Sequence, residues 1–540
     1  MAAGPTDSAR SIAPERQGLV LLALLLVASV ANLNLSVSFV ALPDIGKAFD
    51  ASQTGLDLIA VGYSLGLATS VLYLGAVGDR YGRKLLLELG VLLSIPACLV
   101  AAWAPSEGVL FVARVVGGLS AGMAFPTTLA LITALWSGPA RTRSIALWSA
   151  LGGAIMALGP LVSGALLQHF WWGSVFLVTL PLAVVALLLA VVLVPAHVNE
   201  SNDPVDNLGG ILSMVMIGAL IISINFVAVP NRATLALGLA FVALGAGAGF
   251  VLRQRRASNP LYDLHVAARR VFWVAACAGV IVFGSLMAAV FIGQQFLQNV
   301  LGYSPLDSGA AILPGVVLMV LVAPRSAKLV EERGARFTLL LGYCFILGGF
   351  LTMLVSWTER SSYWPVGLAY AFLGAGVGLA GTPASRSLTN AVPVDRAGMA
   401  SATADLQRDL GGAIMQSILG ALLTAGYASA MAAAIAGVPN GDQVANSTQA
   451  QLQASFASAS NIASQYPQYA VEITAAAESA FVDGANWAYA VGIVAVVLGG
   501  LLVFFMFPRL DAERRLVAEY QTEDGAGADG RSGARDATSR

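Results

Sequence analysis

The segment GAVGDRYGRK, residues 75–84, joins two long apolar stretches of the chain. Gly82 allows a tight reversal of direction, because glycine adopts positive φ angles without steric cost. Asp79 lies in the same segment as three cations, Arg80, Arg83 and Lys84. We interpret the segment as a charge lock between helix ends that breaks as two halves of the molecule rock. The alternative is a plain anchor of positive charge at a membrane surface.

A second copy of this pattern lies in the later part of the chain. Residues 327–336 read AKLVEERGAR, with Gly334 at the position of Gly82. GGLSAGMAFPT at 117–127 and GAGVGLAGTPA at 374–384 are separated by nearly the same number of residues. Two unrelated matches at one offset indicate a duplicated unit of six helices. The offset is long enough to place two additional helices between the copies.

The composition is that of an integral membrane protein. Hydrophobic residues make up 57% of the 540 positions and charged residues only 11%, against about 25% charge in a typical soluble domain. A membrane-spanning helix needs about 20 predominantly apolar residues. We expect fourteen such spans, near residues 18–41, 54–77, 85–103, 108–133, 144–168, 174–195, 208–228, 234–252, 271–294, 306–326, 337–356, 365–388, 410–430 and 485–507.

The distribution of Lys and Arg predicts the orientation, since positive charge remains on the cytoplasmic side. One alternate set of loops and both tails contain nearly all the cations. The other set contains only Lys47, Arg232 and Arg360. We therefore expect both termini to lie in the cytoplasm, with the protein in the inner (cytoplasmic) membrane of a cell.

The spans suggest a division of the chain into five parts. The expected parts are a cytoplasmic N-terminal tail (1–17), a first six-helix half (18–195), two extra helices (196–256), a second six-helix half (257–508) and a cytoplasmic tail (509–540). The second half includes residues 431–484, which contain no Lys or Arg and predict an external excursion with two short helices. The end of the tail, from Gln521, is rich in Gly, Asp and Arg, and we expect it to be disordered.

Three further segments complete a recognisable set of motifs. They are RVVGGLSAG at 114–122, GGAIMALGPLVSG at 152–164 and FLQNVLGYSPLDSGAAILPG at 296–315. Together with GAVGDRYGRK, they make the chain resemble the major facilitator superfamily, and in particular its fourteen-span drug:proton antiporters of the multidrug efflux type. The resemblance extends from Leu33 to Phe507. It implies an all-α membrane protein with the major facilitator fold, in which two six-helix halves are joined by two inserted central helices.

The resemblance assigns conformational roles to eleven motif residues: Gly75, Asp79, Arg80, Gly82, Arg83, Lys84, Arg114, Gly153, Gly159, Pro160 and Gly164. In the fifth span, Ser149, Gly153 and Ala157 recur every four residues, so a neighbouring helix can approach closely. Pro160 then removes a backbone hydrogen bond and weakens the helix. Ordinary close packing is the alternative. The fourth-span motif departs from the family at Gly117, where Gln is usual.

Charged residues inside the spans are candidates for function, because intramembrane charge is costly. Arg114 lies several residues inside the fourth span, and the alternative is that its side chain extends to the outer surface. Asp405, Arg408 and Asp409 have the i, i+3, i+4 spacing of one helix face, and they lie either inside the membrane or at its cytoplasmic interface. The candidate proton-coupling residues are Asp57, Asp307, Asp405, Arg408 and Asp409.

The first span has LNLSVSFVALP at 33–43, where the antiporters have an aspartate at the position of Asn34. An amide forms hydrogen bonds but cannot carry a proton. We expect Asn32 and Asn34 to face a central cavity and to contact substrate or water, together with Gln294 and Gln298. The alternative is an amide contact between helices without a role in transport. The missing acid leaves the recognition of cations and the site of proton coupling open.

These observations predict a secondary active efflux transporter that exports amphiphilic small molecules by alternating access, in exchange for protons. An exporter of a lipid or an endogenous metabolite is the second reading, and a membrane enzyme or sensor is the third. The sequence has neither a phosphate-binding loop nor a cluster of metal ligands. We therefore expect the lipid bilayer, the substrate and the proton as partners, with no cofactor, metal, ATP or nucleic acid.

Overall fold

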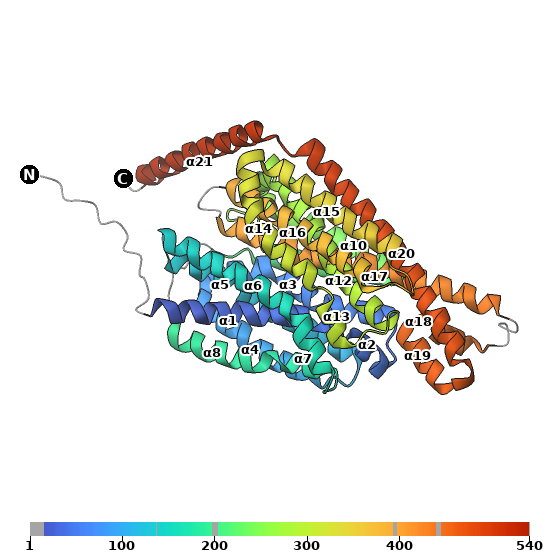
Figure 1. Ribbon diagram of the computed structural model, residues 1–540. Helices are drawn as coiled ribbons and strands as arrows, with labels where there is room; N and C mark the ends of the chain where they lie inside the picture. Colours follow the sequence, from blue (N-terminus) through green and yellow to red (C-terminus); the bar gives the residue numbers. More distant parts are fainter. Residues whose placement is uncertain are drawn as a thin grey trace, which may run out of the picture.

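The computed structural model describes residues 16–136, 138–196, 204–229, 231–392, 397–438 and 444–538. This part of the chain is almost entirely helical, and its long helices form one bundle (Figure 1). Thirteen helical segments in it are long and apolar enough to cross a membrane. α6 (Gly138–Leu167) covers the predicted fifth span, and its segment Leu158–Leu167 is apolar. The helices are thus compatible with fourteen spans. Residues 1–15 of the predicted tail lie outside the described chain.

Eight helices form the first six predicted spans. They are α1 (Gln17–Ser36), α2 (Ser38–Phe49), α3 (Gln53–Tyr81), α4 (Arg83–Ala102), α5 (Glu107–Leu135), α6, α7 (Ser174–Leu177) and α8 (Thr179–Leu193). Serine side chains cap two of them, because Ser52 accepts a hydrogen bond from the N–H of Gly55 and Ser106 accepts one from Val109. The first span is interrupted at Val37, where α1 ends and α2 begins.

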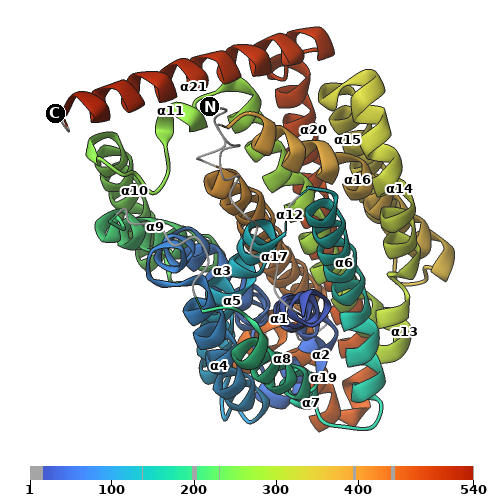
Figure 2. The same cartoon turned by 90° about the vertical axis from the view of Figure 1, so that its left-hand side faces the viewer.

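The later helices are the inserted pair, α9 and α10, followed by those of the second half (Figure 2). They are α9 (Asn207–Val227), α10 (Ala233–Arg256), α11 (Leu264–Ala267), α12 (Arg270–Asn299), α13 (Pro305–Ala310), α14 (Leu313–Arg333), α15 (Ala335–Ser356), α16 (Tyr363–Asn390), α17 (Ala397–Gly437) and α20 (Ala470–Met506). α13 and α14 together form one predicted span.

The two groups of helices repeat the same close contact. In the first, Gly118 of α5 packs so tightly on α3 that an added Cβ would overlap the backbone oxygen of Tyr63. In the second, a Cβ on Gly374 of α16 would overlap the backbone oxygen of Gly315 in α14. Such contacts between small residues are what hold membrane helices together. They support the duplication that the sequence predicts.

The turns after α3 and α14 are also equivalent. Gly82 has a φ of 121° and Gly334 has a φ of 88°, values that residues with a Cβ atom rarely adopt. The glycines that align in the two sequence repeats therefore make the same kind of reversal, as we expected from GAVGDRYGRK.

The pair α9–α10 packs against both groups of helices, with α9 in contact with α3 and with α17. The hydroxyl of Tyr73 in α3 donates to Oδ1 of Asn207 at the start of α9, at 3.0 Å. Nδ2 of Asn225, near the other end of α9, donates to the hydroxyl of Ser417 in α17 at 2.7 Å. The first inserted helix, α9, is thus fixed to both halves, and α10 packs on α9.

Asp206 joins α9 to α10 just outside their membrane-spanning parts. Its carboxylate accepts hydrogen bonds from Arg253 at 2.9 Å, from Gln254 at 2.9 Å and from the N–H of Gly209 at 3.1 Å. Burial alone raises the pKa of this carboxyl, but the three hydrogen bonds outweigh burial and lower the pKa below its usual value. The charged form of Asp206 therefore holds the hairpin together.

The predicted external excursion 431–484 contains the two expected short helices, α18 (Asn446–Ala454) and α19 (Phe456–Gln465). The flanking helices α17 and α20 extend further into it than predicted, and a 3₁₀ turn, Pro467–Tyr469, precedes α20. The Ser455 hydroxyl donates to the carbonyl of Ala51, and Nδ2 of Asn461 donates to Asp50 at 3.1 Å. We call this end of the molecule the α18–α19 end, and there α19 contacts the first half of the chain.

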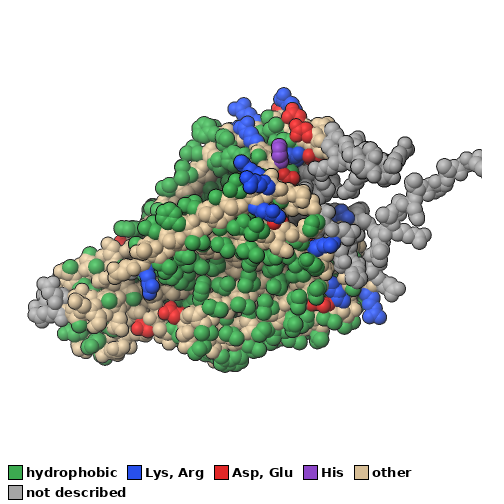
Figure 3. Space-filling view, turned by 180° about the vertical axis from the view of Figure 1, so that it is seen from behind, with side chains coloured by type: hydrophobic (Ala, Val, Ile, Leu, Met, Phe, Trp, Pro, Cys, Tyr) green, Lys and Arg blue, Asp and Glu red, His purple; other side chains and the backbone are tan. Residues whose placement is uncertain are grey.

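Lys and Arg side chains gather at the opposite end, which we call the arginine-rich end (Figure 3). There the C-terminal segment forms α21 (Leu510–Thr538), so the disorder expected from Gln521 onward is not what the structure has. Its first turn contains Asp511 and Glu513, which favour a helix N-terminus. Asp524 also pairs with Arg269 at 2.5 Å, which ties the helix to the start of α12.

Candidate functional site between the two halves

An apolar cavity lies where the two halves meet. It has a volume of about 60 Å³ and is lined from the first half by Leu35, Ser36, Phe39 and Pro160, and from the second half by residues of α12, α14 and α16 and by Ile312. Drug-sized ligands need pockets of roughly 300–1,000 Å³. The cavity must therefore widen before a molecule of that size can enter, which requires the halves to separate.

A buried polar network connects the halves beside this cavity, toward the α18–α19 end. Asp57 of α3 accepts hydrogen bonds from Gln53 at 2.9 Å and from the hydroxyl of Thr424 in α17 at 3.1 Å. Gln53 also donates to Oε1 of Gln295 in α12 at 3.2 Å. The sequence pointed to Asp57 alone. Its partners on other helices have no local signature that could have revealed them.

Gln294 and Gln298 lie at the same interface, where the sequence placed the cavity amides. Nε2 of Gln298 donates to the carbonyl of Val40 in α2 at 2.9 Å, so this amide connects the halves. Gln294 instead exchanges hydrogen bonds with Ser308 and ties α12 to α13. Asp307 is exposed and forms a cap with Ser304 at the start of α13, which explains this acid without a role in coupling.

The asparagines of the first span form hydrogen bonds within their own half. Nδ2 of Asn32 donates to the carbonyl of Ala28 in its own helix at 2.9 Å. Oδ1 of Asn34 accepts from Thr179 at 3.2 Å and from Cys98 at 3.3 Å, on α8 and α4 of the same half. Successive helix positions are rotated by about 100°, so Ser36 can line the cavity while Asn34 points away from it. The contacts of Asn34 agree with the alternative, an amide contact between helices.

Arg114 connects α5 to the interruption in the first span. Its guanidinium donates to the carbonyl of Asn34 at 2.7 Å and to the hydroxyl of Ser38 at 2.9 Å, one on each side of Val37. The residue is only 2% exposed, so its side chain does not extend to the surface. Carbonyls at a helix end lack partners within the helix, and Arg114 supplies a charged one. This position fits a residue that supports the junction between α1 and α2.

Two aromatic rings surround the same guanidinium. Its carbon lies 4.8 Å from the ring centre of Tyr63 and 5.6 Å from that of Phe176. Rings at such distances attract a cation, which partly compensates for its burial.

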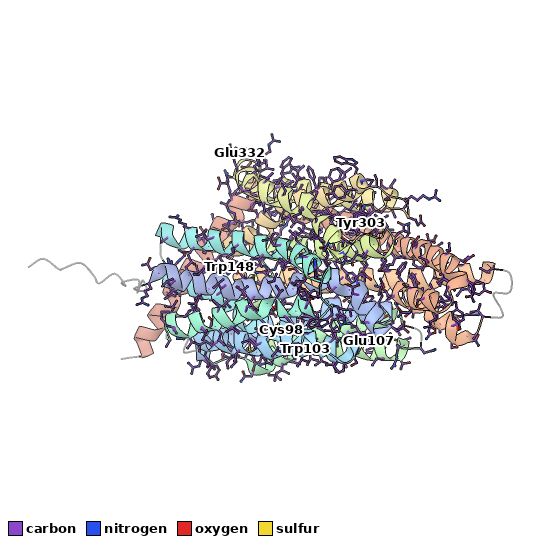
Figure 4. The ribbon with its side chains drawn as sticks, turned by 60° about the horizontal axis from the view of Figure 1, so that its bottom comes forward. Cys98, Trp103, Glu107, Trp148, Tyr303 and Glu332 are labelled. Atoms are coloured by element: carbon purple, nitrogen blue, oxygen red, sulfur yellow. The ribbon has the colours of Figure 1, made fainter. Side chains whose placement is uncertain are left out.

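Cys98, the thiol that donates to Asn34, lies between the two ends of the bundle in Figure 4, with Glu107 toward the α18–α19 end and Trp148 toward the arginine-rich end.

The charged side chains of the segment 75–84 pair within the first half, and their role as a lock stays a prediction. Asp79 at the end of α3 pairs with Arg83 at the start of α4, at 2.7 Å. Lys84 donates to the carbonyl of Val191 in α8 at 2.8 Å and lies 3.6 Å from Glu88. Arg80 is in the last turn of α3.

Gly75, another motif residue of α3, makes no close contact. A Cβ there would meet no heavy atom within 4 Å. The structure therefore gives no packing reason for a glycine at this position.

Glycines of α6 pack closely on both halves. A Cβ on Gly159 would overlap the hydroxyl of Ser36, and one on Gly164 would overlap the backbone oxygen of Pro305 in the second half. The predicted close packing of this span is thus seen at its second part. The side chains of the ladder Ser149, Gly153 and Ala157 lie outside the described part of the chain.

The charged cluster of α17 is buried near the arginine-rich end. Arg408 lies 3.3 Å from Asp409, and its guanidinium carbon lies 4.8 Å from the ring centre of Phe125 in α5. Asp405 and Asp409 are 8% and 2% exposed. The cluster is thus buried within the bundle, and its depth relative to the membrane stays a prediction.

Three comparisons place this architecture among known proteins. The sequence profile of the Major Facilitator Superfamily matches residues 24–416. The multidrug resistance protein Stp of Mycobacterium tuberculosis is 34% identical over 388 residues, which are 72% of this chain and 72% of that protein. The multidrug efflux pump LfrA of Mycolicibacterium smegmatis is 31% identical over 492 residues, which are 91% of this chain and 95% of that protein.

A solved structure shares the fold. It is a bacterial homologue of the human lysosomal transporter Spinster, in an inward-facing and unoccupied conformation. The TM-score is 0.61 at 16% identity, with 95% of this chain and 99% of that chain covered. At this identity the likeness concerns the fold alone.

Proposed function

The chain belongs to the major facilitator superfamily, and from this membership we propose that it exports amphiphilic small molecules such as drugs, dyes and antiseptics. It is a multi-pass membrane protein and a transporter. The relatives that are named as multidrug efflux proteins support the class of substrate. The apolar cavity supports the proposal most directly, because residues of both halves line it. A movement of one half relative to the other therefore changes its volume.

The contacts between the halves fit one state of an alternating-access cycle. In the described part of the chain, the hydrogen bonds between the halves lie toward the α18–α19 end, where they involve Gln298, Thr424, Ser455, Asn461 and the Gln53–Gln295 pair. This end is therefore closed. Transport requires these bonds to break while the halves rock around the cavity.

The distribution of Lys and Arg predicts how the protein is oriented in the membrane. The arginine-rich end faces the cytoplasm under the positive-inside rule, with both termini there, and the α18–α19 end faces outward. The closed end is then the external one, so the transporter is arranged to take up substrate from the cytoplasmic side or the inner leaflet. Export against a gradient needs an energy source, and we assign this to the inward movement of protons.

Proteoliposomes test the proposal directly. The purified protein is reconstituted and given a pH gradient, and the transport of organic cations, neutral amphiphiles and labelled phospholipids is compared with that of protein-free vesicles. We expect gradient-dependent transport of the amphiphilic cations and neutral compounds. Movement of phospholipids only would favour a lipid exporter, and an absence of transport across the panel would contradict drug efflux.

Asp79→Asn is expected to slow efflux while leaving the fold stable. The substitution removes the charge that pairs with Arg83, but the pair is partly exposed, and such pairs contribute only about 0–1 kcal/mol to stability. Efflux of ethidium from cells is measured at matched membrane levels, and thermal unfolding is measured in detergent. Wild-type efflux by Asp79→Asn would show that the segment is only a charge anchor.

A further inference from the structure

We propose that Asp57 is the carboxyl that binds the exchanged proton, and that the proton reaches it from the external side through a pocket bounded by Thr424. The inference rests on the proposed function, since it names the proton site of that exchange. It assigns the coupling to an acid of α3, whereas the first span has the amide Asn34 where the resemblance would place an acid.

The first step is the burial of Asp57. Its residue is 1% exposed, and both carboxyl oxygens accept hydrogen bonds from neutral groups, the amide of Gln53 and the hydroxyl of Thr424. Burying a carboxylate without a cation costs several kcal/mol more than burying the neutral acid. Burial without a cation therefore opposes the charged form in the closed arrangement, the two donated hydrogen bonds offset only part of this cost, and closing is linked to proton binding.

The second step is the set of charges around this carboxyl. Six helices that contact α3 are α1, α2, α4, α5, α9 and α17. α1 and α9 have no charged residue. The charged residues of the other four are Asp44, Lys47, Arg83, Lys84, Glu88, Glu107, Arg114, Asp405, Arg408 and Asp409. Within the described chain, the carboxyl oxygens of Asp57 form no ion pair with any of them. Arg114 instead binds Asn34 and Ser38.

Water in a pocket beside Thr424 gives the proton a route to Asp57. A pocket of about 700 Å³ opens at the α18–α19 end, and residues of α3, α5, α9, α17 and α18 line it, including Thr54, Leu58, Glu107 and Thr424. The Thr424 hydroxyl borders this pocket and also donates to Asp57. A hydroxyl both donates and accepts, so it can pass a proton from pocket water to the carboxyl. Figure 4 shows Glu107 toward this end of the bundle.

The fourth step connects the proton to the movement of the halves. Opening the external end must break the Thr424–Asp57 and Gln53–Gln295 bonds, because each joins α3 to the second half. As the end begins to open, the carboxylate takes up one proton from the pocket water through the Thr424 hydroxyl, and the neutral acid can be buried again when the end closes. Gln295 lies on α12, and other residues of α12 line the apolar cavity. A substrate that moves α12 when it binds in the cavity therefore also moves Gln295, which contacts Asp57 through Gln53.

The test uses the full protein in proteoliposomes, with ethidium as the substrate and a trapped pH dye. Two quantities are measured: ethidium exchange at equal pH on both sides, and proton movement driven by an ethidium gradient. We expect Asp57→Asn to exchange ethidium but to lose the driven proton movement, because the amide mimics the neutral acid. Asp307→Asn, a capping acid at the surface, is the matched control and should move protons as the wild type does.

A second pair of variants covers the case in which Asp57→Asn does not exchange ethidium. Thr424→Val removes the hydroxyl, and Thr424→Ser retains it. We expect slower ethidium-driven proton movement in Thr424→Val than in Thr424→Ser. Proton movement by Asp57→Asn at the wild-type rate, or equal rates in the two Thr424 variants, would overturn the assignment. Failure of the wild type to exchange ethidium at all would instead contradict the proposed function.

Discussion

Gly118→Ala is expected to destabilise the protein strongly and to lower the amount of folded transporter in the membrane. The added Cβ would overlap the backbone oxygen of Tyr63, and a backbone cannot move aside as a flexible side chain can. Overpacking of a tight interior typically costs about 1–3 kcal/mol. Thermal unfolding in detergent and the yield of monodisperse protein after purification measure the effect.

The neighbouring glycine provides a control on the same helix. A Cβ on Gly117 would lie 3.4 Å from the ring of Tyr63, which is an ordinary van der Waals distance. Gly117→Ala should therefore be neutral or slightly stabilising, since Ala is favoured over Gly in a helix by about 1 kcal/mol. Equal loss of stability in both variants would mean that α3 and α5 are not in the close contact described here.

Arg114→Met is expected to abolish drug efflux. The substitution leaves the Asn34 carbonyl and the Ser38 hydroxyl without their charged donor, at the point where the first span is interrupted. Hydrogen bonds to charged groups contribute about 1.5–3 kcal/mol each, so the junction between α1 and α2 loses two of its stabilising contacts. Ethidium efflux from cells at matched expression measures the loss.

Arg114→Lys separates the geometry of the contact from its charge. An ammonium group is a point charge and does not present the planar fork of donors that a guanidinium has. We expect partial efflux from this variant, between those of the wild type and Arg114→Met. Full efflux by Arg114→Met would show that the interruption at Val37 needs no support from α5.

The sequence predicted the spans and the duplication because these depend on local properties. The length of an apolar run decides whether it crosses a membrane, and a tight reversal selects glycine, so Gly82 and Gly334 were visible as a pair. The family resemblance supplied the fold as a whole. The helical extent of α21 was missed because its end is rich in Gly and Asp, whereas its start has strong helix formers.

The directions of the side chains could not be predicted in the same way. Apolar residues surround α1 and α5 nearly evenly, so the pattern does not show which side of a span faces the cavity. For this reason the pattern of α1 does not reveal that Asn34 contacts Thr179 and Cys98 of its own half. Similarly, the partners of Asp57 come from α12 and α17, far away in the sequence, and only the folded chain brings them together.

The two attachments of α9 have a mechanical consequence. The helix is bound to Tyr73 of the first half near one end and to Ser417 of the second half near the other, and its 21 residues make a rod of about 30 Å. A rod that is pinned to two bodies must tilt when those bodies rotate in opposite directions. The two attachments of α9 therefore limit how far the halves can move apart. A chain without the inserted pair of helices lacks this limit.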